Sequence, residues 1–488
     1  MNTNSGRFQI YRRFVRIYKD LDKFTGIVLG ETFRRRLRRL SVAFRYVLYP
    51  EYSSPLEPLI SERSLSLSEQ SPEHPPAWLV EEMRLIGNSI DPQIYPTADR
   101  LLRFRGTTFA LTLRPGTVFQ NILLDCDFDS YNYCFLLPWI MKGGSDKEAL
   151  IILSHLHNTN HKILVILTES IASSWIDKVP IGVTIINIAQ YLEELTNHEQ
   201  REVLARLIIQ LNIKKLHIMN SRLGFESVET YGVQLKHYCN IYLSIYCDDF
   251  DDNDIPSGYA RTHLPLVYEH LTGIICDNSD FPKVLQRQYG YNSVKFYTIC
   301  FPVPSHEPLA RLNSSETPKI LWASRLCRQK KIDQLFKIAE QMPDCIFDVY
   351  GYSYDVYSDV FVNKLKQLNN VVMKGEFNDL TDIRIESYQL FLYTSGWDGM
   401  PNILLEIAAI GLPIVSCVVG GISDLLDEST GFVVIDSSSH VNYVNTIRYA
   451  LSNPLICQER ALAAQDRIKN KYSNSQFVAS LSSVPNYL

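Results

Sequence analysis

The stretch from Tyr393 to Gly421 places the strongest constraint on the fold, because it joins a glycine-rich loop to a short apolar helix and then to an apolar strand. The loop covers residues 395–402, and Glu406 lies on the helix. Pro401 suits the first turn of that helix, and Gly411 ends it. A helix start opened by glycines presents free N–H groups and partial positive charge, which favours phosphate. An ordinary loop, helix and strand of a buried sheet, with Glu406 in solvent, is the alternative interpretation.

This stretch resembles the signature of the retaining nucleotide-sugar glycosyltransferases of the large fourth family, which have the GT-B fold. The matching residues are Gly399, Met400, Pro401, Asn402, Glu406, Gly411, Pro413, Gly420 and Gly421. Asp398 stands where the family usually has Glu, so the charge is kept and the reach is one methylene shorter. The resemblance implies that Glu406 holds the ribose hydroxyls of a nucleotide. It places Asp398 beside the donor sugar, and the amides of residues 399–402 near the sugar hydroxyls.

A second motif carries the cations that such a donor requires. The family has Gly-Arg-Leu-x-x-x-Lys-Gly, and residues 324–331 read Ser-Arg-Leu-Cys-Arg-Gln-Lys-Lys, which keeps both cations and loses both glycines. The resemblance implies that Arg325 and Lys330 contact the donor diphosphate, where fixed cations and helix N–H groups stabilise the leaving charge without a metal. Solvated charges at a helix start are the alternative. Gly351, at a strand end, is expected near the base pocket. The candidate catalytic residues are Asp398, Glu406, Arg325 and Lys330.

Length and composition exclude several classes of protein. The 488 residues are enough for two domains and an extension, and 46% apolar with 21% charged residues is an ordinary globular composition. A net charge of −5 gives no reason to expect nucleic acid binding. Ten scattered cysteines without a C-x-x-C pair favour reduced thiols in a cytoplasmic protein and no metal site. No apolar run approaches a membrane-spanning length and no signal peptide opens the chain, so we expect a soluble or peripheral protein.

Residues 7–49 are strongly basic and interleaved with aromatic and aliphatic side chains at helical spacing. Residues 1–50 are therefore expected to form a basic amphipathic helical extension, followed by a linker over residues 51–76 that is rich in Pro, Ser and Glu. A basic amphipathic helix suits an anionic membrane surface, such as the inner face of the cell membrane. Docking on a neighbouring domain or exposure to solvent is an equal alternative, and nucleic acid is a minor one.

The remaining chain alternates apolar strand-like runs with helical segments, which is typical of an open, mostly parallel sheet with helices on both faces. We predict an α/β chain of two doubly wound Rossmann-like domains that face each other across a cleft. The amino-terminal domain with its leading extension covers residues 77–304, the hinge covers 305–318, and the carboxy-terminal nucleotide-sugar domain covers 319–488. Ligands of such sheets bind at the loops that follow the carboxyl ends of the strands.

The amino-terminal domain resembles one subset of the family, found in bacterial surface-polysaccharide assembly. The matching segments are residues 138–146, 217–221, 247–249 and 277–278. The resemblance implies that Gly143 and Gly144 approach the donor diphosphate. The acceptor-side candidates are Asp146, His217, Asn220, Asp248 and Asn278. His217, at a strand end, is equally well explained as a core histidine satisfied by its neighbours.

The leading hypothesis is a retaining, metal-independent hexosyltransferase that uses a UDP-, GDP-, ADP- or dTDP-sugar and no further cofactor. Its acceptor would be a glycan or a lipid-linked glycan of an O-antigen or capsule type, and its partners would include other glycosyltransferases. A different GT-B activity, such as a phosphorylase or an epimerase, is one alternative. A weakened GT-B module that acts as a scaffold for partner enzymes is another, because Asp398 and the lost glycines depart from the family pattern. Adjacent carboxylates such as Asp248 and Asp249 are not a hydrolase pair, because neighbouring residues on an extended chain point apart.

Overall fold

The computed structural model describes residues 77–102, 109–125, 131–304, 306, 317–353 and 356–488. The chain divides into two compact units, Met1–Leu113 and Arg114–Leu488. The predicted basic extension and the linker both lie outside the described residues. None of the helices that the structure describes has the length and apolar character needed to span a bilayer. The helices before the first sheet are α4 (Ala77–Ser89), α5 (Ala98–Leu102) and α6 (Phe109–Asp125), with the short 3-10 helix η2 (Pro92–Ile94) between α4 and α5.

Within residues 131–304, seven parallel strands form one sheet in the order β3-β2-β1-β4-β5-β8-β9. The strands are β1 (Tyr133–Leu137), β2 (Ile163–Leu167), β3 (Thr184–Asn187), β4 (Lys215–Met219), β5 (Asn240–Ile245), β8 (Gly273–Cys276) and β9 (Phe296–Thr298). A separate antiparallel pair joins β6 (Asp249–Phe250) to β7 (Pro256–Ser257). This sheet and its helices are the amino-terminal domain.

The inner strands of this sheet are buried on both faces, because helices cover each side, whereas the edge strands β3 and β9 are mainly half-buried. The helices are α7 (Gly144–Asn158), α8 (Ala189–Leu192), α9 (Asn197–Gln210), α10 (Arg222–Tyr238), α11 (Tyr259–Thr262), α12 (Leu264–Val267) and α13 (Asp280–Tyr289). Alternate side chains of β1 enter different cores: Cys134 and Leu136 pack into one, and Tyr133, Phe135 and Leu137 pack into the other. This two-residue alternation is the geometry of a strand.

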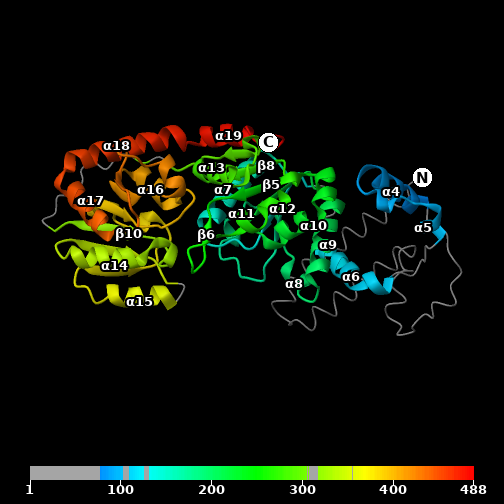
Figure 1. Ribbon diagram of the computed structural model, residues 1–488, viewed down its shortest axis with the longest axis horizontal. Helices are drawn as coiled ribbons and strands as arrows, with labels where there is room; N and C mark the ends of the chain where they lie inside the picture. Colours follow the sequence, from blue (N-terminus) through cyan, green and yellow to red (C-terminus); the bar gives the residue numbers. More distant parts are fainter. Residues whose placement is uncertain (1–76, 103–108, 126–130, 305, 307–316, 354–355) are drawn as a thin grey trace. The chain divides into compact units, whose positions relative to one another are not determined.

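Within the described part of residues 317–472, six parallel strands form a second sheet in the order β12-β11-β10-β13-β14-β15. Its strands are β10 (Lys319–Ala323), β11 (Ile346–Tyr350), β12 (Val371–Gly375), β13 (Leu390–Tyr393), β14 (Ile414–Cys417) and β15 (Phe432–Val434). Its helices are α14 (Ile332–Gln341), α15 (Val356–Leu365), α16 (Asn402–Ile410) and α17 (His440–Ser452). This sheet and its helices, seen around β10 in Figure 1, are the carboxy-terminal domain.

The end of the chain returns to the amino-terminal domain. Helix α18 (Pro454–Lys471) packs on the carboxy-terminal domain, and α19 (Asn474–Ser482) lies over the amino-terminal domain (Figure 1). Phe477, Leu481, Val484 and Tyr487 belong to the same core as the strand β1. The predicted boundary, which assigned all of residues 319–488 to the carboxy-terminal domain, therefore needs correction, because the last residues complete the core of the other domain.

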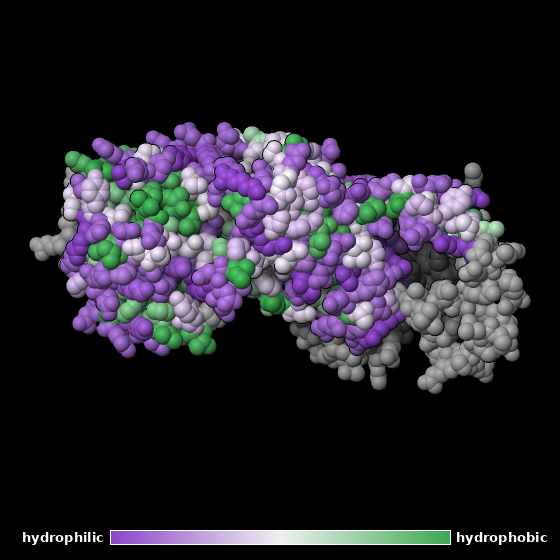
Figure 2. All heavy atoms as spheres, in the orientation of Figure 1, coloured by the Kyte–Doolittle hydropathy of each residue, from purple (hydrophilic) through white to green (hydrophobic). Residues whose placement is uncertain are grey.

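The face seen in Figure 2 is mainly polar over both of these domains, and apolar atoms gather there in separate patches. On α15, Val356 and Val360 are exposed, and Tyr357 between them is partly exposed. The cysteines of the described residues are free thiols, and most of them are buried.

Candidate active site

The glycine loop, residues 394–401, connects the buried strand β13 to helix α16. Pro401 precedes the helix with φ −67° and ψ 117°, so α16 begins at Asn402 and Pro401 lies just before its first turn. Pro401 supplies no capping side chain, which leaves the positive end of the helix dipole facing outward. The helix ends at Gly411, whose φ of 87° is left-handed. The loop therefore presents a helix N-terminus at the carboxyl ends of the strands.

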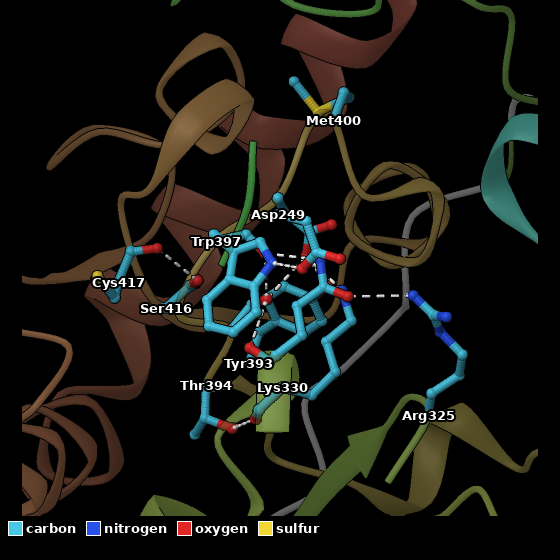
Figure 3. A network of polar contacts seen from close by, with 12 residues as sticks. Asp249, Arg325, Lys330, Tyr393, Thr394, Trp397, Met400, Ser416 and Cys417 are labelled. Atoms are coloured by element: carbon cyan, nitrogen blue, oxygen red, sulfur yellow. Dashed lines mark hydrogen bonds and ion pairs between the residues drawn. The ribbon is translucent and has the colours of Figure 1, made fainter. Parts of the chain in front are cut away.

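A buried ion pair ties the glycine loop to the segment before α14. Lys330 ends the short helix η6 (Arg328–Lys330), is 6% exposed, and forms an ion pair with Asp398. Its Nζ also lies 2.8 Å from Tyr393 Oη. Tyr393 and Ser395 donate hydrogen bonds of 2.7 and 2.8 Å to the same carboxylate oxygen, Asp398 Oδ2. Figure 3 shows this network. Three donors on one oxygen hold the Lys330 ammonium in a fixed place.

Burial and the adjacent Asp398 raise the pKa of Tyr393 well above its ordinary value, so the phenol stays protonated and donates. Two backbone contacts reinforce the arrangement. Thr394 Oγ1 donates to Lys330 O at 2.7 Å, and Gly396 N donates to Gln329 O at 2.8 Å. The two loops that carry the predicted charged residues are thus one hydrogen-bonded unit.

Arg325 lies outside the buried pair. Its side chain is exposed, and Nη2 donates to Gln329 Oε1 at 3.1 Å. Gln329 Nε2 in turn donates to Trp397 O at 2.9 Å. In Figure 3, Arg325 reaches toward the Lys330 group from its own strand end. An exposed guanidinium next to a fixed ammonium is suited to an anion that carries two phosphates.

Gly351, the predicted base-pocket residue, occupies a position that only glycine fits. Its φ is 139°, and a Cβ built there would lie 1.9 Å from Ser324 O. The carboxyl ends of β11 and β10 come together at this point, so a larger residue would push the Arg325 loop out of place.

Asp277, which follows β8, reaches the glycine loop from the amino-terminal domain. Its Oδ2 accepts a 2.7 Å hydrogen bond from Met400 N, and its Oδ1 accepts one from Asn278 Nδ2 at 2.6 Å. A Cβ at Gly399 would lie 2.5 Å from Asp277 Oδ2, so this close approach requires glycine. Burial raises the pKa of Asp277 to about 7. Both residues directly follow a buried strand and lie in the matched segment 277–278, but only Asn278 was predicted as a site residue.

Glu406 and Lys147 form a second contact between the domains. Lys147 lies in the first turn of α7, and its Nζ forms an ion pair with Glu406 Oε1. Asn402 Nδ2 donates to Gly144 O at 3.4 Å, so the starts of α7 and α16 are adjacent. Gly143 is the residue that precedes α7, and it supplies no capping side chain. The structure therefore brings Gly144 beside Asn402, and Lys147, which was not among the predicted site residues, beside Glu406.

The β6–β7 pair also contacts the glycine loop. Trp397 Nε1 donates to Asp249 Oδ1 at 3.2 Å, and the Trp397 ring lies 5.1 Å from the ring of Phe250. Arg328 donates to Phe250 O at 3.1 Å and to Asp254 Oδ1 at 2.6 Å. The acidic side chains here serve contacts between the domains.

His217 lies in the core. It is fully buried, with Nδ1 2.7 Å from Tyr487 Oη and Nε2 2.8 Å from Ser244 Oγ. Burial lowers its pKa to about 3, so the ring is neutral. Both ring nitrogens are satisfied inside the protein, which favours the core-histidine interpretation over contact with an acceptor.

The other acceptor-side candidates differ in their surroundings. Asp146 accepts from Met141 N at 3.0 Å, and burial raises its pKa. Asp248 forms a two-pronged ion pair with Arg261, which occupies both carboxylate oxygens. Asn220 has a left-handed φ of 56° in the turn after β4. Asn278 is fully buried, and its Nδ2 donates to Tyr246 O at 2.8 Å. Of these residues, Asp146 lies in the first turn of α7.

Glu148, on α7, is a buried carboxyl group that the sequence analysis did not select. It is 3% exposed, and its Oε2 has no hydrogen-bond partner within the described residues. Burial, and then the nearby Asp277, raise its pKa well above the ordinary value. Because the folded protein holds a proton that the unfolded chain releases, stability falls as pH rises above about 4.5.

We therefore expect the free energy of unfolding to depend less on pH in Glu148→Gln than in the wild type. Between pH 5 and 8, the free energy of unfolding of the variant should rise relative to the wild type by about 1.4 kcal/mol per pH unit at most. Urea unfolding at several pH values measures it, with the exposed Glu428→Gln as the matched control. A constant difference between Glu148→Gln and wild type across this range would show that Glu148 is ionised in the folded protein.

Within the described residues, no group of three or more His, Cys, Asp or Glu side chains is arranged to hold a metal ion. Arg325, Lys330, Lys147 and Glu406 are charged residues at this place. Such a set is chemically suited to an anion that also carries hydroxyl groups.

Comparison with protein families matches residues 309–471 to the model for glycosyl transferases group 1. Over 108 residues, the chain is 27% identical to the Vi polysaccharide biosynthesis protein VipC/TviE of Salmonella typhi, which covers 21% of this chain and 19% of that protein. Over 175 residues, it is 24% identical to the O-antigen biosynthesis glycosyltransferase WbnH of Escherichia coli, which covers 36% of this chain and 49% of that protein. The matches thus span less than half of each of these relatives.

Among solved structures, Alr3699/HepE of Anabaena in complex with UDP and glucose is similar to this chain. The TM-score is 0.58 at 16% identity, and the match covers 72% of this chain and 100% of that one. This likeness confirms the predicted α/β architecture of two Rossmann-like domains, the GT-B fold. The carboxy-terminal domain, which holds Arg325, Lys330, Asp398 and Glu406, lies almost entirely within the region matched by the group 1 model.

Proposed function

We propose that this chain is a retaining, metal-independent glycosyltransferase that moves a hexose from a nucleoside-diphosphate sugar to a glycan or lipid-linked acceptor. The observation that carries this proposal is the arrangement at the carboxyl ends of the second sheet. There, Lys330 pairs with Asp398 of the glycine loop that leads into α16, Arg325 donates to the neighbouring Gln329, and Glu406 lies on α16 itself. The match of residues 309–471 to glycosyl transferases group 1 supports it.

In this proposal, the protein stabilises the charge that develops on the departing diphosphate. Arg325, Lys330 and the first N–H groups of α16 bind the phosphate oxygens. Glu406 accepts hydrogen bonds from the ribose hydroxyls. Asp398 orients Lys330 and lies beside the donor sugar, as the family resemblance implies. The amides of residues 399–402 bind the sugar hydroxyls.

The bond between the anomeric carbon and the diphosphate oxygen breaks, and the electron pair leaves with the diphosphate. The acceptor oxygen forms the new bond on the same face of the sugar, and the acceptor proton passes to the leaving phosphate. No protein nucleophile takes part, so the fixed cations supply the main stabilisation. This is the route that the family resemblance implies.

We infer that the acceptor belongs to bacterial surface polysaccharide, because two relatives are named for the Vi polysaccharide and for O-antigen biosynthesis. The proposal places the reaction at the inner face of the cell membrane, where a lipid-linked acceptor is met. The basic composition of residues 7–49 suits contact with that surface.

Nucleotide binding tests the donor site directly. The full chain is heated with UDP, GDP, ADP or dTDP, and with their sugar conjugates, in the absence of added metal. We expect one nucleotide class to stabilise the fold, by about 2.7 kcal/mol at 100 times its Kd. Glu406→Ala should remove this stabilisation, whereas Glu428→Ala, at an exposed glutamate, should keep it.

A catalytically weakened module that serves as a scaffold for partner enzymes is the second candidate. The loss of the family glycines at positions 324 and 331 and the aspartate at position 398 favour this candidate. If no nucleotide stabilises the wild-type chain, the transferase proposal is wrong and the scaffold takes its place.

A further inference from the structure

Lys147 is the one cation from the amino-terminal domain that pairs with a predicted donor-binding carboxylate among the described residues. It forms an ion pair with Glu406 Oε1, although the two residues are 259 positions apart in the sequence. The side chains are 37% and 24% exposed, so the pair is open to solvent. A partly exposed pair of this kind contributes little to stability. The contribution of this ion pair to folding stability is therefore a weak explanation for a lysine at position 147.

The position of Lys147 on its own helix also argues for a ligand. It lies in the first turn of α7, close to the positive end of the helix dipole. A cation is disfavoured at that end, whereas the adjacent Asp146 is favoured. An anion bound at the starts of α7 and α16 would offset this repulsion, because the two helix starts are adjacent through Asn402 and Gly144 O.

Ligand binding changes the hydrogen-bond donors and the charges that surround the Glu406 carboxylate. A ribose donates hydrogen bonds to the carboxylate, and the diphosphate brings new negative charge to the same place. Lysine has a flexible four-carbon stem and three donors, so its ammonium moves readily between neighbouring anions. Lys142, which lies just before α7, donates instead to the Phe377 carbonyl and pairs with no predicted donor-binding carboxylate.

We propose that Lys147 is a nucleotide-binding residue that exchanges partners, holding Glu406 in the free protein and binding the donor diphosphate when ribose takes Glu406. This inference rests on the proposed donor site and adds to it a diphosphate contact from the amino-terminal domain. Donor binding then replaces a direct contact between the domains with one made through the ligand, because the lysine of one domain contacts a ligand held by the other.

Lys147→Met in the full chain tests the exchange, since methionine keeps most of the length and removes the charge. The Kd of the nucleoside and that of the nucleoside diphosphate are measured by calorimetry for the base that the wild type binds. We expect the diphosphate to bind about tenfold more weakly. The nucleoside should bind equally well or more tightly, because Lys147 no longer competes for Glu406. Lys147→Arg should retain most of the affinity for the diphosphate.

Lys337→Met is the matched control, because Lys337 forms a partly exposed ion pair with Asp333 on α14. It should change neither Kd. If Lys147→Met weakens both ligands by the same factor, or weakens neither, the partner exchange is wrong while the donor site stands. If the wild type binds neither ligand, the proposed function fails and the exchange fails with it.

Discussion

Lys330→Met is expected to lower the rate of sugar transfer by about 10²–10³-fold, the effect of removing one fixed group that stabilises developing charge. The ammonium is held by Asp398 and by Tyr393 Oη at 2.8 Å, so it is already in place before the donor arrives. No reorganisation is needed when charge develops on the diphosphate. Initial rates with the donor identified by thermal shift measure the effect. Full activity in this variant would remove Lys330 from the donor site.

The same substitution should also destabilise the protein, because Asp398 would remain with no cation. The side chains of Lys330 and Asp398 are 7% and 14% exposed, so water screens the stranded charge poorly. Breaking a buried pair in this way costs about 3–5 kcal/mol. A low transfer rate in Lys330→Met alone therefore does not distinguish the loss of a charge at the site from the loss of folded protein.

The double variant, Lys330→Met with Asp398→Asn, separates the two effects. It removes the uncompensated charge, and Tyr393 and Ser395 can still donate to the amide oxygen. Urea unfolding should show that most of the stability returns, while transfer stays low. Equal destabilisation in the single and double variants would show that the stranded carboxylate is not the cause. Lys337→Met serves as the control for loss of a lysine on the surface.

Much of the fold could be predicted because its signals are local. The apolar runs at residues 319–323, 346–350 and 390–393 predict strands and the amphipathic residues 332–341 predict a helix; strands β10, β11 and β13 and helix α14 have these bounds. Residues 147–158 also predict a helix, but α7 starts three residues earlier, at Gly144. Glycine is a weak helix former, and here the surrounding structure prevails over propensity.

The contacts that define the site could not be predicted, because they join residues far apart in the sequence. Asp277 meets Met400 across 123 positions, and Lys147 meets Glu406 across 259. Asp277 lies in a matched segment at a strand end and Lys147 lies near a helix start, but neither local pattern identifies the residue that it contacts in the other domain. The family resemblance supplied Glu406 and Lys330 but not their partners. His217 shows the same limit: it was predicted at a strand end, whereas it is the central residue of β4 and is fully buried in the core.

Deleting residues 473–488 is expected to prevent the amino-terminal domain from folding. The deletion removes Phe477, Leu481, Val484 and Tyr487 from the core that also holds the strand β1. Each large buried side chain contributes several kcal/mol, and truncating one buried aromatic to alanine costs about 3–5 kcal/mol. The sum, about 10 kcal/mol or more, is comparable to the 5–15 kcal/mol that stabilises a typical domain. Circular dichroism and thermal unfolding of the deleted chain measure this loss.

Two point variants show whether the segment acts through its buried contacts or only through its length. Tyr487→Phe keeps the ring and removes the hydroxyl 2.7 Å from His217 Nδ1, which should cost about 1–3 kcal/mol because a buried ring nitrogen loses its partner. Tyr487→Ala should cost about 3–5 kcal/mol more, since it also leaves a cavity. Leu488→Ala, at a residue 42% exposed, is the control and should be neutral. If Tyr487→Ala unfolds at the wild-type urea concentration, the segment is not part of the core. If the expected order holds, the carboxyl end of the chain completes the fold of the domain that precedes the hinge.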